Sequence, residues 1–113
     1  MSADTLSRLV ATIRARRSAD AGQSYTRQLL DGGAEKCARK LGEEAIEAVI
    51  AGVGGTAEQL TAEAADVLFH LLVLLEARGI PFAEVAKVLE ARMQTSGLEE
   101  KARRSGADPA GPG

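Results

Sequence analysis

The stretch AADVLFHLLVLL, residues 64–75, decides the fold, because it is apolar almost all round and only Asp66 and His70 interrupt it. A helix with this pattern is buried on most of its sides. Just upstream, residues 56–59 read TAEQ and have the form of a capping box, and Gly79 follows downstream. We therefore expect one long helix that begins after Thr56 and stops at Gly79.

Apolar residues at helical spacing predict three further helices. The first begins with Asp4 or Thr5 as its N-cap and fades in the basic run at residues 14–17. The second runs from about residue 34 to residue 51, where glycines end it, and the last has Pro81 at its first position.

The remaining segments carry less regular structure. Residues 18–33 are polar and punctuated by glycine, so we expect a loop there with one helical turn near residues 26–30. The sequence shows no strand of convincing length. We therefore expect an all-α bundle of four to five helices, forming a single domain over residues 1–104, with a disordered Gly/Pro tail at residues 105–113.

Composition supports this fold class and excludes some functions. Of 113 residues, 45% are hydrophobic but only 3% are aromatic, so Ala, Leu, Val and Ile must build the core, which favours packed helices. A net charge of −2 does not suit a general nucleic-acid or membrane binder. The single Cys37 excludes an internal disulfide and fits a reducing compartment. We expect a cytoplasmic protein.

Glutamates of the second helix lie where core residues belong. On a helical wheel, Cys37, Ala48 and Ala51 fall within about 40° of Glu44. Glu47 lies about 60° from Glu44. Glu44 is thus inside the apolar face, which is unusual for a solvated residue. Ile46 and Ile50 occupy a second face of this helix, which indicates packing on two sides and a partner subunit.

The two long helices are expected to be antiparallel neighbours, because their connection is short. Glu44 and Glu47 are three residues apart on one helix, as Glu63 and Asp66 are on the other, so all four carboxylates converge. Several of them must be protonated, or a cation must lie between them. Oxygen ligands suit Mg²⁺, with Mn²⁺ as the second choice, and such a site serves phosphate chemistry.

The same residues resemble a known family. The sequence EEAIE at residues 43–47, followed by EAAD at 63–66, is similar to the E-E-x-x-E…E-x-x-D motif of the MazG-like all-α nucleotide pyrophosphohydrolases. Flanking blocks narrow the resemblance to the phosphoribosyl-ATP pyrophosphohydrolase family. These blocks are SYT at 24–26, EKC at 35–37, KLGEEA at 40–45, HLLVLL at 70–75 and SGLEEK at 96–101.

The resemblance implies an activity: hydrolysis of 1-(5-phosphoribosyl)-ATP to 1-(5-phosphoribosyl)-AMP and pyrophosphate, the second step of histidine biosynthesis. It also implies Mg²⁺ dependence and a homodimer or dimer of dimers. We expect a Mg²⁺-activated water as the nucleophile, and from the charge we expect no nucleic acid and no membrane as partner. The metal ligands it implies are Glu44, Glu47, Glu63 and Asp66. Glu43, Glu44 and Glu47 would be catalytic, Glu43 by holding a second metal or positioning water.

Further site residues are expected around this centre. Lys36 and Lys40 can meet phosphates, or pair with Glu44 one turn away. His70 is either a residue that orients Asp66 or an ordinary core histidine. The resemblance alone assigns substrate contacts to Ser24, Tyr25, Ser96 and Lys101.

Four other interpretations stay open at this point. The carboxylates of the two helices could form a salt-bridge network with lysines and arginines instead of a metal site. The protein could be a house-cleaning pyrophosphohydrolase of free nucleoside triphosphates, or a redox bundle of the ferritin type, although the Glu-x-x-His pattern of that type fails here. It could also be a non-enzymatic helical interaction module.

Overall fold

The structure, a computed structural model, describes residues 3–94 and 104, and it is helical throughout its regular segments. The prediction of an all-α fold is confirmed, since these residues contain no strand. In chain order the elements are α1 (Ala3–Ala15), a short 3₁₀ helix η1 (Arg16–Ser18), α2 (Tyr25–Asp31), α3 (Gly33–Gly54), α4 (Ala57–Ala77) and α5 (Phe82–Met93).

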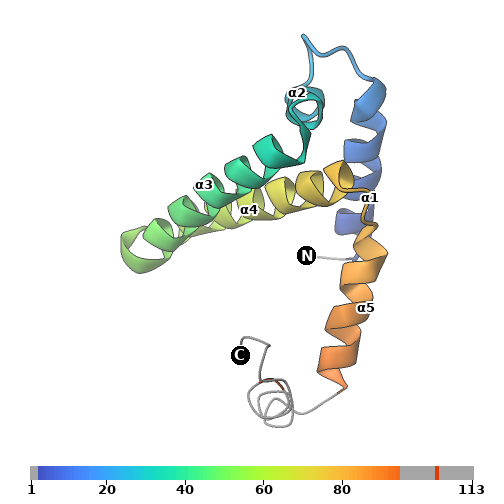
Figure 1. The fold of residues 1–113 in the computed structure, drawn as a ribbon. Coiled ribbons are helices and arrows are strands. Elements are labelled where there is room, and N and C mark those ends of the chain that lie inside the picture. The colour runs from blue at the N-terminus through green and yellow to red at the C-terminus, as the bar shows by residue number, and fades with distance from the viewer. Residues whose placement is uncertain (1–2, 95–103, 105–113) are drawn as a thin grey trace. The chain divides into compact units, whose positions relative to one another are not determined.

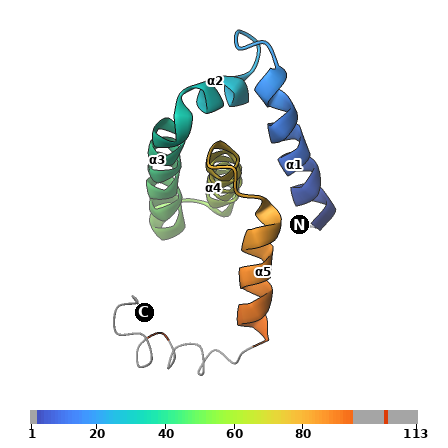
Figure 2. The ribbon, with the colours of Figure 1, turned by 45° about the vertical axis from the view of Figure 1, so that its right-hand side comes forward.

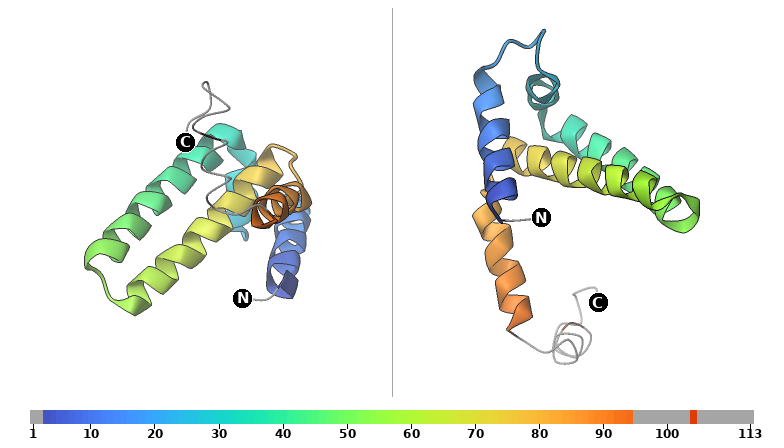
Figure 3. Two further views of the ribbon diagram at one scale, coloured as in Figure 1. Left: turned by 90° about the horizontal axis from the view of Figure 1, so that it is seen from below. Right: turned by 180° about the vertical axis from the view of Figure 1, so that it is seen from behind.

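Helices α3 and α4 form a long antiparallel hairpin (Figures 1 and 3). The predicted capping box opens α4: the Thr56 hydroxyl accepts from the Gln59 N–H at 3.1 Å, and the Gln59 side chain accepts from the Thr56 N–H at 2.9 Å. Helix α3 runs three residues past its predicted end, because its ladder continues to a 2.9 Å bond from the Gly55 N–H to the Ala51 carbonyl. Interior glycine costs a helix only about 1 kcal/mol and does not forbid it.

Helices α1 and α2 pack against the hairpin near the end of α4. Figure 2 shows α4 between α3 and α1, with α2 linking these two. The core lies where the four helices meet, with Ile13 of α1, Leu29 of α2, Cys37 of α3 and Val73 of α4 all buried. This core fixes the end of the hairpin to which α2 is attached.

Three local predictions need correction. The segment expected as a loop with one turn contains a seven-residue helix, α2, because Ser24 supplies an N-cap that the composition of the loop did not reveal. Gly33 then breaks the chain direction with φ = 81°, a value that favours glycine. Helix α1 already includes Asp4 and Thr5, so neither is its N-cap. Pro81 is the N-cap of α5 and not its first residue.

The first half of α4 is more exposed than its sequence predicts. Leu60 is 41% exposed, and Ala64 and Ala65 are exposed as well. Arg14 of α1 contacts Glu76, and Tyr25 of α2 contacts His70, and both of these α4 residues lie in its second half. Within one chain, α3 alone is too narrow to bury the first half of α4.

The chain divides into two compact units, residues 1–80 and 81–113. In the second unit, the amphipathic helix α5 carries an exposed ion pair between Lys87 and Glu84 at 3.2 Å. The expectation of a single domain over residues 1–104 stays a prediction, and the expected tail at 105–113 lies outside the described residues. Within the described part of the chain, no helix combines the length and apolarity that crossing a membrane requires.

Candidate active site

Three of the predicted carboxylates come together across the α3–α4 hairpin. Glu44 of α3 and Glu63 and Asp66 of α4 each offer an oxygen atom, and these atoms lie within 4.8 Å of one another. Glu44 and Glu63 are half-buried, whereas Asp66 is exposed. The i,i+3 spacing on α4 and the antiparallel neighbour produce this convergence, as the sequence predicted.

Glu47, the fourth predicted ligand, joins the group through Glu44. Its hydrogen bond to Glu44 is the main cause that raises the pKa of Glu44, and burial adds to it. Burial raises the pKa of Glu63, and the negative charges of Glu47 and Asp66 raise it further. We call Glu44, Glu47, Glu63 and Asp66 the carboxylate cluster.

The cluster lacks a positive partner within the described residues. No ion pair joins a lysine or arginine there to any of its four members. The Glu63 Oε2 atom is buried and has no hydrogen-bond partner. The alternative of an interhelical salt-bridge network therefore lacks support in the described part of the chain.

This donor set fits a hard divalent cation. All ligand atoms are carboxylate oxygens, which Mg²⁺ and Mn²⁺ prefer. A hydrogen bond to Glu47 raises the pKa of Glu44 and burial raises that of Glu63, with repulsion between the carboxylates as a smaller cause. A cation beside the cluster would favour the ionised carboxylates, and it would give the buried Glu63 oxygen a partner. Since Asp66 and Glu47 are exposed, one side of the cluster is open to a ligand.

A cleft of about 490 Å³ adjoins the cluster near the turn of the hairpin. Two cluster residues, Glu47 and Glu63, line it together with largely apolar or small residues: Ile50, Ala51, Gly54, Gly55 and Gln59. The cluster thus lies at the edge of a concave surface.

The predicted lysines lie on the same helix, toward α2. Lys40 pairs with Glu43 at 3.1 Å, and not with Glu44 as one alternative held. This hydrogen bond and the Glu43 charge raise the pKa of Lys40, with smaller contributions from Tyr25 and Glu44. Lys36 lies over Gly32, where a Cβ atom would collide with its aliphatic chain.

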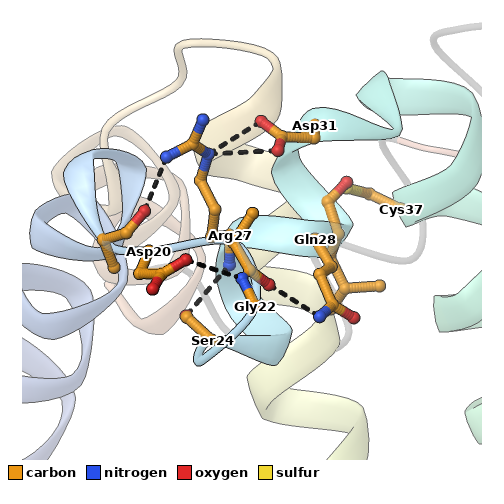
Figure 4. Close-up of polar contacts among 10 residues, drawn as sticks. Asp20, Gly22, Ser24, Arg27, Gln28, Asp31 and Cys37 are labelled. Carbon is orange, nitrogen blue, oxygen red and sulfur yellow. Dashed lines mark hydrogen bonds and ion pairs between the residues drawn. The ribbon is translucent and has the colours of Figure 1, made fainter.

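Ser24 and His70 have structural partners of their own. Ser24 is buried, and its hydroxyl accepts from the Arg27 N–H at 3.2 Å, which caps α2 (Figure 4). The His70 Nδ1 atom lies 2.8 Å from the backbone carbonyl of Asp66, and its Nε2 lies 3.3 Å from the Tyr25 hydroxyl. His70 therefore contacts the backbone of a cluster residue and not its carboxylate.

Other positions were missed by sequence reasoning or lie outside the structure. Phe69 stacks near Tyr25, with ring centroids 6.4 Å apart, and it was not predicted as a site residue. No spacing rule relates residues so distant in sequence, although the scarcity of aromatic residues in the chain is a signal in itself. Ser96 and Lys101 lie outside the described residues.

Fold and site together define an all-helical protein that presents a carboxylate cluster suited to phosphate chemistry. The sequence model of the phosphoribosyl-ATP pyrophosphohydrolase family matches residues 6–93. The chain therefore belongs to the phosphoribosyl-ATP pyrophosphohydrolase family. This assignment confirms the expected enzyme class, a hydrolase acting on a phosphoanhydride, over the ferritin-type and non-enzymatic alternatives.

Similar proteins from bacteria agree with the family. The chain is 58% identical over 99 residues to a phosphoribosyl-ATP pyrophosphatase of Cereibacter sphaeroides (strain ATCC 17029 / ATH 2.4.9), covering 88% of this chain and 96% of that one. It is 57% identical to the phosphoribosyl-ATP pyrophosphatase of Dinoroseobacter shibae, covering 88% and 97%. It is 56% identical to phosphoribosyl-ATP pyrophosphatase 1 of Bradyrhizobium diazoefficiens, covering 88% and 94%.

Proposed function

We propose that this protein hydrolyses 1-(5-phosphoribosyl)-ATP to 1-(5-phosphoribosyl)-AMP and pyrophosphate in the cytoplasm, as the second step of histidine biosynthesis. The names of its relatives support this substrate. The observation that carries the proposal is the meeting of Glu44, Glu63 and Asp66 within 4.8 Å, inside the segment that the family matches.

The carboxylate cluster would hold Mg²⁺, or Mn²⁺ in its place. When bound, this cation neutralises phosphate oxygens and lowers the pKa of a water molecule. Glu44, Glu63 and Asp66 would hold the cation from both helices, and Glu47, which lies beside Glu44, would be the fourth ligand once the proton of their hydrogen bond is lost. Because the residues stand on helices, little reorganisation is needed when charge develops.

Lys36 and Lys40 would contact the anionic part of the substrate. Both are half-buried on α3, and Lys40 lies one turn before Glu44. A lysine held by Glu43 stays charged, since the pKa of Lys40 is raised, and can offer its remaining hydrogens to a phosphate. Glu43 is exposed, so we assign it the positioning of Lys40 or of water.

We also propose that the protein works as a homodimer or a dimer of dimers. Ile46, Val49, Ile50 and Val53 form an apolar stripe along α3, and they are 63%, 65%, 65% and 87% exposed. An uncharged stripe can pair with itself about a two-fold axis in a second copy of the chain. An Ile46→Asp variant should therefore be smaller than the wild type in light scattering coupled to size exclusion; an unchanged mass would contradict this assembly.

The substrate proposal is tested by measuring pyrophosphate release. The purified protein is incubated with phosphoribosyl-ATP or with a panel of ordinary nucleoside triphosphates, in Mg²⁺ and in chelator. We expect release from phosphoribosyl-ATP that depends on the metal, and little from the panel. Release mainly from free triphosphates would move the protein to the house-cleaning alternative.

A further inference from the structure

Three ring-bearing side chains gather beside the carboxylate cluster. The chain has one Tyr, two Phe, one His and no Trp, and three of these rings, Tyr25, Phe69 and His70, contact one another. Phe69 and His70 meet edge to face at 5.0 Å, and Tyr25 meets His70 edge to face at 6.1 Å. We call these three residues the ring cluster.

Hydrogen bonds fix the orientation of Tyr25. A carbonyl oxygen can only accept, so the His70 Nδ1 atom carries a proton and donates it to the Asp66 carbonyl at 2.8 Å. The tautomer with this single ring proton leaves Nε2 as an acceptor, to which the Tyr25 hydroxyl can donate at 3.3 Å. The Tyr25 hydroxyl is thus hydrogen-bonded within the protein, and the Tyr25 ring stacks with Phe69.

The backbone that carries Tyr25 is also held. Tyr25 is the first residue of α2, directly after the capping Ser24. The loop before it is tied to α2, because Arg27 donates to the Ala19 carbonyl at 2.6 Å and Gln28 donates to the Ala21 carbonyl at 2.7 Å (Figure 4). Although it is anchored in this way, Tyr25 remains 51% exposed.

We infer that the free face of Tyr25 is the surface on which the purine ring of the substrate stacks. A base stacks on an aromatic face that is open and rigid, and such stacking is tolerant of base identity. The cleft near the cluster, lined by Ile50 and Gly54, contains no aromatic side chain. This inference rests on the proposed function for the identity of the substrate, but it concerns only how the purine is held.

The spacing of the ring cluster from the carboxylates fits a nucleotide. Asp66 and His70 are four residues apart on α4, so one helical turn of about 5.4 Å separates them. Tyr25 contacts His70 on the side of Asp66 that lies away from the turn of the hairpin. A purine on Tyr25 would thus lie about one helical turn from the carboxylate cluster, which leaves the phosphates to extend toward the cluster.

The first test uses the wild-type chain, whose only tyrosine is Tyr25. With ¹³C-labelled tyrosine, its ring signals are followed by NMR while AMP or ribose 5-phosphate is added in the presence of Mg²⁺. We expect AMP to move these signals upfield, because a stacked purine shields the ring, and ribose 5-phosphate to leave them in place. Unmoved signals at the highest AMP concentration, or equal shifts with both compounds, would overturn the inference.

The second test separates stacking from a structural role. Tyr25→Leu should raise the KM for phosphoribosyl-ATP roughly 5- to 150-fold with a much smaller change in kcat, whereas Tyr25→Phe keeps the ring and should stay within a few-fold of wild type. Tyr25→Leu should also weaken inhibition by AMP but not by pyrophosphate. Equal weakening of both inhibitors, or an unchanged KM, would reject the purine site.

The two tests distinguish this inference from the proposed function. If wild-type protein does not hydrolyse phosphoribosyl-ATP and yet AMP shifts the Tyr25 signals, the proposed substrate is wrong and the purine site stands. If hydrolysis proceeds and Tyr25→Leu has the KM of wild type, the substrate stands and the purine site is wrong.

Discussion

Glu76, near the end of α4, and the carboxylate cluster, nearer its start, differ in their ion pairs and in the direction of their pKa shifts. Near its end, Glu76 is only 12% exposed and accepts from Arg17 at 2.5 Å and from Arg14 at 3.4 Å. Burial alone would raise the pKa of Glu76, but the two arginines outweigh it and the pKa is lowered. In the carboxylate cluster nearer its start, Glu44 and Glu63 have raised pKa values, and no arginine or lysine among the described residues forms an ion pair with any cluster member.

The difference separates a structural carboxylate from one kept for a ligand. Glu76 joins α4 to α1 through Arg14 and to η1 through Arg17, so its negative charge is paired within the chain. The cluster lowers the stability of the folded protein by its own repulsion, a cost that is expected where a site must bind something else. Substitutions in the cluster and at Glu76 should therefore have opposite effects on activity and stability.

Neutralising one cluster residue should separate activity from stability most clearly. We expect Glu44→Gln or Glu63→Gln to lower turnover by roughly a hundredfold or more, because electrostatic contributions of this size are typical of such sites. The metal-free variants should be at least as stable as wild type, since repulsion is removed. The measurements are pyrophosphate release and thermal unfolding, with Glu58→Gln, an exposed site on α4, as the matched control. Near-normal turnover in both variants would refute the assignment.

Metal should stabilise the wild type through the cluster. A ligand at about 100 times its Kd adds about 2.7 kcal/mol, so we expect Mg²⁺ to raise the Tm by about 10 °C or more. Chelator should reverse the shift, Glu44→Gln should lack most of it, and Glu76→Gln should keep it. A shift that survives in Glu44→Gln would place the metal elsewhere.

Removing the charge of Glu76 should do the opposite of removing that of Glu44. Two charge-assisted hydrogen bonds to a largely buried carboxylate are lost, although Arg14 and Arg17 are 62% and 48% exposed and partly screened. We expect Glu76→Gln to lower the free energy of unfolding by roughly 1–2 kcal/mol, with activity retained at permissive temperature. Denaturant unfolding checks this value, with the exposed Glu84→Gln as control. A gain in stability would contradict the structural role.

The two kinds of carboxylate should also act in different pH ranges. Glu44 and Glu63 have pKa values raised above 4.5 in the folded protein. Their contribution to the free energy of unfolding is therefore fully present below that pH and is lost as pH rises through the folded pKa values. Glu76 has a pKa lowered below 4.5, so its contribution is present above that pH and is lost as pH falls. In the metal-free protein, the free energy of unfolding measured against pH should fall both above and below this range. The fall at higher pH should be weaker in Glu63→Gln, and the fall at lower pH should be weaker in Glu76→Gln.

Local rules predicted most of the helices and the position of the cluster. The capping box at Thr56, the apolar periodicity and the i,i+3 spacing of Glu63 and Asp66 depend on neighbours in sequence, and each appears in the structure. Glu44 could be placed among apolar residues because a helical wheel needs no tertiary information. The roles of these residues as metal ligands stay predictions.

Contacts between distant segments could not be predicted in the same way. Arg17 and Glu76 are 59 residues apart, and Tyr25 and His70 are 45 apart. The basic run at residues 14–17 was expected only to end a helix, and nothing local reveals that it meets Glu76. The choice of Glu43 over Glu44 by Lys40 is equally a matter of side-chain geometry, since both lie within reach along the helix.

That choice leads to the smallest expected effect on stability. The Lys40–Glu43 pair is exposed on the glutamate side, and such pairs contribute little, so Glu43→Gln should move the Tm by no more than about 2 °C. If Glu43 only holds Lys40, its loss should raise KM while kcat stays near wild type. If it positions water or a second metal, kcat should fall with little change in KM. Steady-state kinetics with phosphoribosyl-ATP decide between these roles. A large loss of stability would show that Glu43, like Glu76, has a mainly structural role.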